Sequence, residues 1–278
     1  MSYRIGSFNV GGPKSLILTD AEAVAEIIKR HRFDIVAFQD MHGNVEVVDS
    51  FLRAVCKHLH RFEYRFSRGR SADRSFAFIW STVTISIVDE PRIYERVYRE
   101  DRPNATDEWP FKRDPLLGRF MTRNGYEIRL INIHLFFSDM QQRVRECARI
   151  TGNMYYDIAS IVPENIGIKV FTFALGDYNF DCETCNSISR ENLFFDIVTT
   201  QRDSTTLNKS NASDGGLTSS GLSGNSYDHF TYDKNKVESA IRNPPMAIDA
   251  PREEGFSGNY TKYLNEVSDH IPVIIEIF

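Results

Sequence analysis

Residues of three polar types, Asp, Asn and His, stand at the ends of several apolar segments of this chain. The segments comprise residues 7–10, 38–40, 132–135, 175–179, 227–230 and 268–272. Their polar members are Asn9, Asp40, His134, Asp177, Asn179, Asp228, Asp269 and His270. Hydrolysis of a phosphodiester needs groups of this kind, because water must lose a proton, the leaving oxygen must gain one, and phosphoryl charge must be neutralised.

Each requirement has a matching residue type in these segments. Carboxylate and carboxamide oxygens are the ligands that Mg²⁺ takes, and the bound metal acts as Lewis acid and clamp. Histidine exchanges protons near neutral pH. The sequence therefore predicts metal-dependent phosphodiester hydrolysis at a site built on Asp177, Asn179, Asp269, His270 and His134.

Taken singly, each residue has an ordinary structural interpretation. Asn9 alone is typical of a turn, and Asp177 with Asn179 could serve turn geometry, which favours Gly, Asp and Asn. Asp269 and His270 could be a solvated entry to the strand that follows them. The hydrolase prediction depends on the residues acting together.

The composition limits the classes of partner. The chain has 278 residues, 41% of them hydrophobic, and a formal net charge of -5. An acidic balance argues against tight binding of nucleic acid, whose phosphates attract Lys and Arg. It permits a turnover enzyme, because carboxylates that hold metal ions stay negative until the metal arrives.

The sequence also bears on location. No apolar run approaches the roughly 20 residues that cross a bilayer. Residues 1–5 lead directly into a strand-like segment, without the basic and apolar regions of a secretory leader. We expect a cytoplasmic protein if the chain is full length, and a secreted one if a leader has been removed.

Apolar periodicity indicates an α+β fold of mixed sheets covered by helices. Residues 203–226 are polar and predict a long loop, and residues 101–115 predict a second irregular loop. Helices are expected at residues 20–30, after Thr19 as N-cap, and at 45–58 and 139–161. Strands are expected at residues 5–10, 34–38, 76–80, 82–88, 127–134, 168–175, 227–232 and 271–278.

Three motifs together resemble the endonuclease/exonuclease/phosphatase superfamily. Residues 176–179, Gly-Asp-Tyr-Asn, match its Gly-Asp-Phe-Asn motif. Residues 132–135 match its Asn-x-His-Leu strand, and residues 268–273 are close to its C-terminal signature. Any one motif is weak, but their order and spacing extend the resemblance over nearly the whole chain.

Two loops are similar to the deoxyribonuclease I branch of that superfamily. Residues 111–115 resemble its Phe-x-Arg-x-Pro loop, and residues 203–206 resemble the Asp-Thr-Thr loop before its Tyr-Asp strand, here at residues 227–229. The resemblance implies a single catalytic domain, residues 1–278, with four α-β-β-α layers: two packed mixed sheets flanked by helices.

The resemblance also implies a metal site. Asn9, Asp40 and Asp269 would hold an essential Mg²⁺, with Mn²⁺ as an alternative. Asp177 and Asn179 would position a second metal, the attacking water or the phosphate. The resemblance leaves open whether Ca²⁺ binds elsewhere.

Further roles follow from the same resemblance. His134 and His270 would act as general acid and base, and Asp228 would orient His270 through a carboxylate–imidazole hydrogen bond. Arg113, Thr205 and Thr206 would contact the substrate. For Arg113, a structural salt bridge is a close alternative.

The chain departs from the family pattern at several positions. Asp40 stands where the family usually has Glu, so direct metal binding would need a shifted backbone or metal. Asp73 is a weak candidate for the carboxylate that orients the first histidine, at an offset that differs by one residue. Cys182 lacks its usual disulfide partner, because Ser226 occupies that position. Together with Cys185 it predicts either ordinary thiols or a small local disulfide, with a structural metal site as the less favoured alternative.

Three functions remain in competition. The first is an endonuclease that acts on DNA, favoured by the two branch-specific loops. The second is a small-molecule or lipid phosphodiesterase or phosphatase of the same superfamily, which suits the acidic net charge. The third is a non-catalytic binding module on the same scaffold, suggested by Asp40. No obligate protein partner is indicated.

Overall fold

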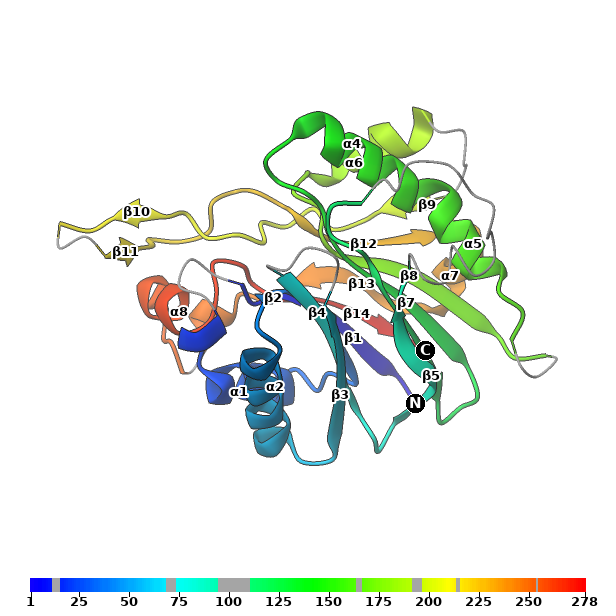
Figure 1. Ribbon diagram of the computed structural model, residues 1–278, viewed down its shortest axis with the longest axis horizontal. Coiled ribbons are helices and arrows are strands. Elements are labelled where there is room, and N and C mark those ends of the chain that lie inside the picture. Colours follow the sequence, from blue (N-terminus) through cyan, green and yellow to red (C-terminus); the bar gives the residue numbers. More distant parts are fainter. Residues whose placement is uncertain are drawn as a thin grey trace.

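Two six-stranded sheets pack against each other and carry helices on their outer faces (Figure 1). A separate two-stranded hairpin projects from this body. The arrangement confirms the predicted four layers. The computed structural model describes residues 1–11, 16–68, 74–94, 111–163, 167–191, 197–213, 216–253 and 255–278.

The first sheet contains the strand that leads to Asn9 and the strand that carries Asp40. Within it, β1 runs parallel to β2 and antiparallel to β14. The strand order is β13 (Ile241–Ala247), β14 (Val273–Ile277), β1 (Tyr3–Asn9), β2 (Ile35–His42), β4 (Arg74–Ser81) and β3 (Phe62–Arg68).

The second sheet fixes the relative positions of three predicted site residues. Parallel pairing of β7 with β8 sets His134 beside Asp177, and antiparallel pairing of β12 with β8 sets Asp228 beside the same Asp177. The strand order is β5 (Ile85–Ile93), β6 (Leu116–Thr122), β7 (Glu127–His134), β8 (Val170–Asp177), β12 (Asp228–Asp233) and β9 (Ile197–Thr199).

A continuous apolar core fills the space between the two sheets. Phe78 of β4 meets Phe120 of β6 edge to face, with ring centroids 5.4 Å apart. Ile5, Ile35 and other inward residues of the first sheet join this cluster, together with inward residues of the second sheet. Because both sheets bury one face here, a slip of one residue in any register would expose apolar side chains.

Helices cover the outer faces of both sheets. On the first sheet lie η1 (Leu16–Leu18), α1 (Ala21–Arg30), α2 (Val45–Leu59), η4 (Ala250–Arg252) and α8 (Tyr260–Glu266). On the second lie α4 (Met140–Arg149), η2 (Ile150–Met154), α5 (Tyr155–Ser160) and α6 (Cys182–Glu191). The short helices α7 (Lys234–Val237) and η3 (Glu238–Ala240) follow β12.

Two details of the helices differ from the sequence prediction. The cap of α1 is Asp20 rather than Thr19, and its carboxylate accepts hydrogen bonds from the backbone of Glu22 and Ala23. The long helix predicted over residues 139–161 is interrupted by the π-helical segment η2, where Gly152 has non-helical angles, φ −125° and ψ −123°. Glycine permits this break because it has no Cβ.

The polar loop predicted at residues 203–226 has little regular secondary structure in its described part and contains one short hairpin. Its strands are β10 (Ser210–Asn211) and β11 (Leu217–Thr218), and they pair antiparallel. The hairpin contacts α8, where the Ser219 amide donates a hydrogen bond of 3.1 Å to the hydroxyl of Thr261. The prediction missed it because these strands have polar residues on both faces, and periodicity detects only buried faces.

Parts of some predictions lie outside the described residues. These are Asp73 and residues 101–110 of the second predicted loop. Along the described ranges, no helix is both long and apolar enough to span a membrane.

Asn132 lies in β7 but hydrogen-bonds to the other sheet. Its Nδ2 donates to the backbone oxygens of Phe38, at 2.9 Å, and Ala77, at 3.1 Å. Its Oδ1 accepts from Nε2 of Gln39 at 2.8 Å. Phe38 and Ala77 are paired just before the β2–β4 register shifts. Asn132 therefore supports the irregular end of β2 that carries Asp40.

Replacing Asn132 with Ala should leave buried carbonyl groups without a donor. We expect a loss of about 2–4 kcal/mol in the free energy of unfolding, measured by urea denaturation. The exposed Asn211 is the matched control, and Asn211→Ala should change stability by less than about 0.5 kcal/mol. Equal small effects of both substitutions would show that Asn132 does not join the sheets energetically.

Candidate active site

A cavity of about 340 Å³ opens where the ends of β1, β2, β7 and β8 meet. Most of the side chains around it are polar or charged. They belong to Asn9, Asp40, Arg74, Arg113, His134, Phe137, Asp177, Asn179, Thr206, Leu207, Lys209, Asn225, Tyr227, Asp269 and His270, and Gly11 completes the lining. The structure thus brings together most of the residues that the sequence singled out.

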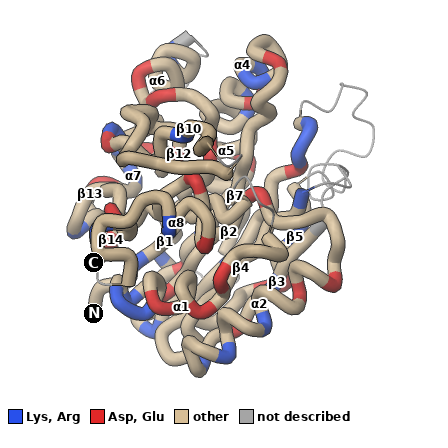
Figure 2. Tube along the Cα trace, turned by 90° about the vertical axis from the view of Figure 1, so that its left-hand side faces the viewer, with Lys and Arg blue, Asp and Glu red and all other residues tan. Residues whose placement is uncertain are grey.

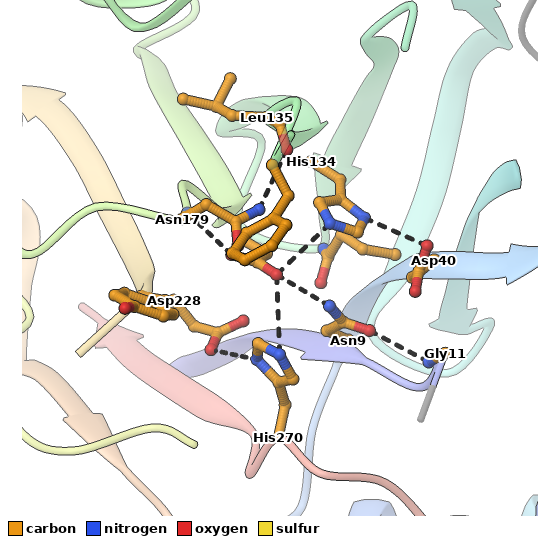
Figure 3. A network of polar contacts seen from close by, with 12 residues as sticks. Asn9, Gly11, Asp40, His134, Leu135, Asn179, Asp228 and His270 are labelled. Atoms are coloured by element: carbon orange, nitrogen blue, oxygen red, sulfur yellow. Dashed lines mark hydrogen bonds and ion pairs between the residues drawn. The ribbon is translucent and has the colours of Figure 1, made fainter. Parts of the chain in front are cut away.

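The carboxylate of Asp177 contacts Asn9, His134, Asn179 and His270, which are labelled in Figure 3. Its Oδ2 accepts a hydrogen bond from Nδ2 of Asn9 at 2.9 Å. The same oxygen lies 3.4 Å from Nε2 of His134 and 3.7 Å from Nε2 of His270. Burial raises the pKa of Asp177, and the two imidazoles oppose that rise. Two proton-exchanging rings therefore converge on one buried carboxylate.

Asn179 completes the turn that follows β8. Its backbone amide donates to Oδ1 of Asp177 at 2.8 Å, and its Nδ2 donates to the backbone oxygen of Leu135 at 3.0 Å. The residue has a left-handed φ of +51°, which Asn tolerates better than most residues. The geometry of Asn179 fits the turn interpretation, and the residue also lines the cavity.

His270 is paired with Asp228. Its Nδ1 lies 2.7 Å from Oδ2 of Asp228 (Figure 3), and its Nε2 lies 3.7 Å from Oδ2 of Asp177. Burial lowers the pKa of His270, but the carboxylates of Asp228 and Asp177 outweigh it and raise the pKa to about 10. His270 is therefore an imidazolium at neutral pH.

Asp40 sits at the irregular end of β2 with a left-handed φ of +57°. Its carboxylate lies 2.9 Å from Nη1 of Arg74 and 3.4 Å from Nδ1 of His134. Burial acts to raise the pKa of Asp40, but His134, Arg74 and Arg113 outweigh it and lower the pKa to about 2. Asp40 is therefore ionised and forms an ion pair with Arg74.

Asp269 is anchored to the segment that leads into the hairpin. Its backbone oxygen accepts from the amide of Leu207 at 2.8 Å, and Thr206 forms a β-bridge with His270. Lys209 places its Nζ 2.5 Å from Oδ2 of Asp269. Burial acts to raise the pKa of Asp269, but His270 and Lys209 outweigh it and lower the pKa.

Comparison with protein-family models and with curated proteins finds no match. Solved structures match nearly the whole chain. An endonuclease/exonuclease/phosphatase family protein from Bacteroides thetaiotaomicron aligns with TM-score 0.65 and 15% identity, covering 100% of this chain and 95% of its own. The chain has the endonuclease/exonuclease/phosphatase fold.

Two further structures share this endonuclease/exonuclease/phosphatase fold with the chain. A mannosyl-6-phosphatase from Bacteroides thetaiotaomicron VPI-5482 aligns with TM-score 0.65 and 15% identity, covering 99% of each chain. TDP2 from D. rerio, solved with a single-strand DNA product, aligns with TM-score 0.64 and 14% identity, covering 100% of this chain and 99% of its own.

The predicted substrate-contacting residues take different places. Arg113 lines the cavity, and its Nη1 donates to the backbone oxygen of Leu135 at 3.3 Å. Thr206 lines it as well. Thr205 is fully buried, and its hydroxyl accepts from the amides of Tyr227 and Asp228. Thr205 therefore positions the start of β12 rather than lining the cavity.

Sequence reasoning missed several side chains at the cavity. Lys209 and Arg74 pair with Asp269 and Asp40, and Phe137 lies at the rim. Lys209 lies in a polar segment and Arg74 opens a strand, so neither carried a local signal. Phe137 follows the predicted Asn-x-His-Leu strand after one intervening residue, Phe136. Its closeness to that motif was the one available cue.

Glu146 was also missed, and it holds two loops of the site together. Its carboxylate accepts from the backbone amides of Lys112 and Phe136, both at 2.8 Å, and from Gln142 at 3.0 Å. The first loop carries Arg113 and the second leads from His134 into α4. Glu146 is buried, which raises its pKa despite these donors.

The oxygen-rich donor set of this fold fits a hard divalent cation. Asn9, Asp40 and Asp269 line one cavity, and Oδ1 of Asp40 is buried without a hydrogen bond among the described residues. A second group, Asp177, Asp228 and His270, also has potential ligand atoms within 4.8 Å of one another. That group suits a metal less well, because a protonated imidazole cannot coordinate one.

The cysteines are free thiols. Cys182 and Cys185 are buried at the start of α6, and neither forms a disulfide. The structure therefore shows thiols at this pair rather than the small local disulfide.

His229 is buried beneath the site. Its Nε2 lies 2.7 Å from the backbone oxygen of Phe180, and its ring meets Tyr178 edge to face. Burial lowers the pKa of His229 from 6.5 to about 4. Because the unfolded chain binds this proton more readily, the neutral ring destabilises the fold progressively as pH falls from about 6.5 to about 4.

Replacing His229 with Gln should remove this part of the acid sensitivity. The pKa difference corresponds to roughly 3 kcal/mol in full, and to about 2 kcal/mol at pH 4.5. We expect the wild type to lose about that much more stability than His229→Gln between pH 7 and pH 4.5, measured by urea denaturation. Identical losses in the two proteins would contradict the buried neutral state of His229.

Proposed function

We propose that this protein is a divalent-metal-dependent hydrolase of phosphoesters. The observation that carries the proposal is the convergence of two imidazoles, His134 and His270, on the buried carboxylate of Asp177. An oxygen-donor set for a hard cation faces the same cavity. General acid–base groups and a metal site are the two components that phosphoester hydrolysis needs.

Asn9, Asp40 and Asp269 would hold the metal, Mg²⁺ or Mn²⁺. When bound, such an ion polarises the phosphoryl group and neutralises its developing charge. Asp40 is one methylene shorter than the Glu that the family usually has, and its left-handed backbone, with a φ of +57°, helps to set the position of its carboxylate. Oδ2 of this carboxylate lies so close to Gly11 that a Cβ there would be 2.2 Å away.

The imidazolium of His270 can stabilise phosphoryl oxygens and give a proton to the leaving oxygen. Asp228 holds its Nδ1, which orients the ring. Burial raises the pKa of Asp177, so its carboxylate accepts the proton of the attacking water more readily than an exposed carboxylate would. Nδ1 of His134 faces Asp40, which orients the ring, and Nε2 faces Asp177, from which it can accept the proton. In this scheme His270 is the acid, and Asp177 is the base.

An endonuclease acting on DNA is the leading specific activity within this class. Arg74, Arg113 and Lys209 bring three positive side chains to the cavity, where they suit the phosphates of a nucleic acid strand. TDP2, solved with a single-strand DNA product, has the same fold. Nucleic acid, and DNA first, is therefore the substrate class to test.

A small-molecule phosphatase or phosphodiesterase is the second candidate. The net charge is -5, and Lys and Arg are interspersed with Asp and Glu along the described part of the chain (Figure 2). Long polyanions favour a continuous basic surface instead. The mannosyl-6-phosphatase with this fold is consistent with a compact substrate. A non-catalytic module is less well supported, because the acid–base groups are assembled.

Removing either imidazole, that of His134 or that of His270, should strongly slow turnover. We expect His134→Ala and His270→Ala to lower kcat at least 10²-fold. Asp228→Asn should lower it about 10²-fold or more, because the amide no longer holds the imidazolium. The exposed Asn211→Ala should have no effect. Rates are measured with Mg²⁺ on plasmid, single-stranded oligonucleotide, bis-p-nitrophenyl phosphate and mannose 6-phosphate.

The substrate panel separates the candidate functions. Cleavage of plasmid supports the endonuclease, and cleavage of mannose 6-phosphate alone supports the phosphatase. No turnover of any substrate by the wild type, or equal turnover by His134→Ala, would rule out the proposed hydrolase.

Replacing Lys209 with Met should tighten metal binding. The ammonium of Lys209 competes with a cation for Asp269, so its removal leaves that carboxylate without its positive partner. We expect Mn²⁺ affinity to rise several-fold, measured by calorimetry. Lys262 is the matched control, because it is equally exposed and pairs with Glu266 on α8. Unchanged affinity in Lys209→Met would argue against Asp269 as a metal ligand.

A further inference from the structure

We propose that Phe137 forms a stacking subsite for a planar aromatic ring that the substrate carries beside its reacting phosphate. The ring is either a nucleobase or an aryl group, which share this chemistry. The inference rests on the proposed hydrolase function and narrows its substrate class to phosphoesters that bear such a ring.

The side chain of Phe137 is exposed to solvent, where an apolar group contributes little to the stability of the fold. Its side chain is 64% exposed, although it lines the same cavity as His134 and Asn179. It lies in the turn between β7, which ends at His134, and α4 (Figure 1). An exposed aromatic ring at the mouth of a polar cavity is more typical of a recognition surface than of a core.

Arg143 of α4 holds the loop that carries Phe137 in place. Nη1 of Arg143 donates to the backbone oxygen of Phe137 at 3.2 Å. The guanidinium carbon of Arg143 lies 5.7 Å from the Phe137 ring centroid and 4.5 Å from that of Phe180. Arg143 itself is buried, and the preceding amide of Phe136 is bound by Glu146.

This support makes the exposed ring a pre-organised platform. A cation beneath an aromatic ring attracts its face, and buried neighbours restrict the motion of that cation. A platform that is already ordered costs less conformational entropy when a ligand stacks on it. The tethering of Phe137 through Arg143 is therefore the arrangement that stacking recognition requires.

The remaining lining favours a ring over other apolar groups. The cavity that Phe137 lines also presents Asn179, Arg113 and Tyr227, which are polar or amphipathic. A long acyl chain would need an extended apolar wall, and the described lining residues do not form one. A planar ring needs one flat face and tolerates polar edges. The cavity volume of about 340 Å³ is at the small end for ligand sites and suits a phosphate with one ring.

Binding of phosphonates tests this subsite, because their P–C bond is not hydrolysed. The 278-residue protein with Mg²⁺ is titrated by calorimetry with methylphosphonate, phenylphosphonate, cyclohexylphosphonate and the phosphonate analogue of thymidine 5′-monophosphate. We expect phenylphosphonate to bind about tenfold more tightly than methylphosphonate. Cyclohexylphosphonate should bind more weakly than phenylphosphonate, because it has no π face.

Substitutions at Phe137 should change the ring preference and leave phosphonate binding itself intact. Phe137→Ala should reduce the tenfold preference to near unity, and Phe137→Trp should retain it. Ile17 is the matched control, because its side chain is 63% exposed and does not line the cavity. Ile17→Ala should keep the full preference.

The outcomes separate this inference from the function on which it rests. Equal binding of methyl and phenyl compounds by the wild type, equal binding of phenyl and cyclohexyl compounds, or a preference that survives in Phe137→Ala, would overturn the subsite alone. No binding of any phosphonate would count against both the hydrolase and the subsite. Tighter binding of the thymidine analogue than of phenylphosphonate identifies a nucleobase, and the reverse order identifies an aryl group.

Discussion

The carboxylate of Asp177 is the constraint on which the site depends. It is 2% exposed, and a buried carboxylate is costly unless charged or hydrogen-bonding groups surround it. Its partners come from three directions: Asn9 from the first sheet, His134 from the neighbouring strand, and His270 from the C-terminal segment. These contacts exist only if both sheets keep their registers and pack together.

Around Asp177, the other carboxylates of the site each pair with a positively charged side chain. Asp228 pairs with the imidazolium of His270, Asp40 with Arg74, and Asp269 with Lys209. Each carboxylate at the cavity therefore has a positive neighbour, so the folded chain avoids a cluster of unopposed negative charges. If these carboxylates bound a metal, as we propose, the same cations would be free to bind phosphate groups.

The outer helices also contribute to the site, although none of their side chains sits at its centre. In α4, Glu146 binds the amides of Lys112 and Phe136, and Arg143 supports Phe137. A helix that covers a sheet thus also fixes the loops at the edge of that sheet. The hairpin of β10 and β11 leans on α8, and the segment that leads into it brings Lys209 to the cavity.

The sequence alone determined the identity of the central residues and the class of fold. Asp177, His134 and His270 were recognisable because short motifs keep their order. Apolar periodicity predicted mixed sheets covered by helices, and the family resemblance implied that two such sheets pack in four layers. The sequence did not determine the partners of those residues, because Lys209, Arg74 and Glu146 reach the site through contacts between distant segments. Local pattern cannot encode such contacts, since they depend on packing and side-chain direction. Only the tertiary structure decided that Thr205 is buried, that Gly152 interrupts a helix and that Phe137 faces the cavity.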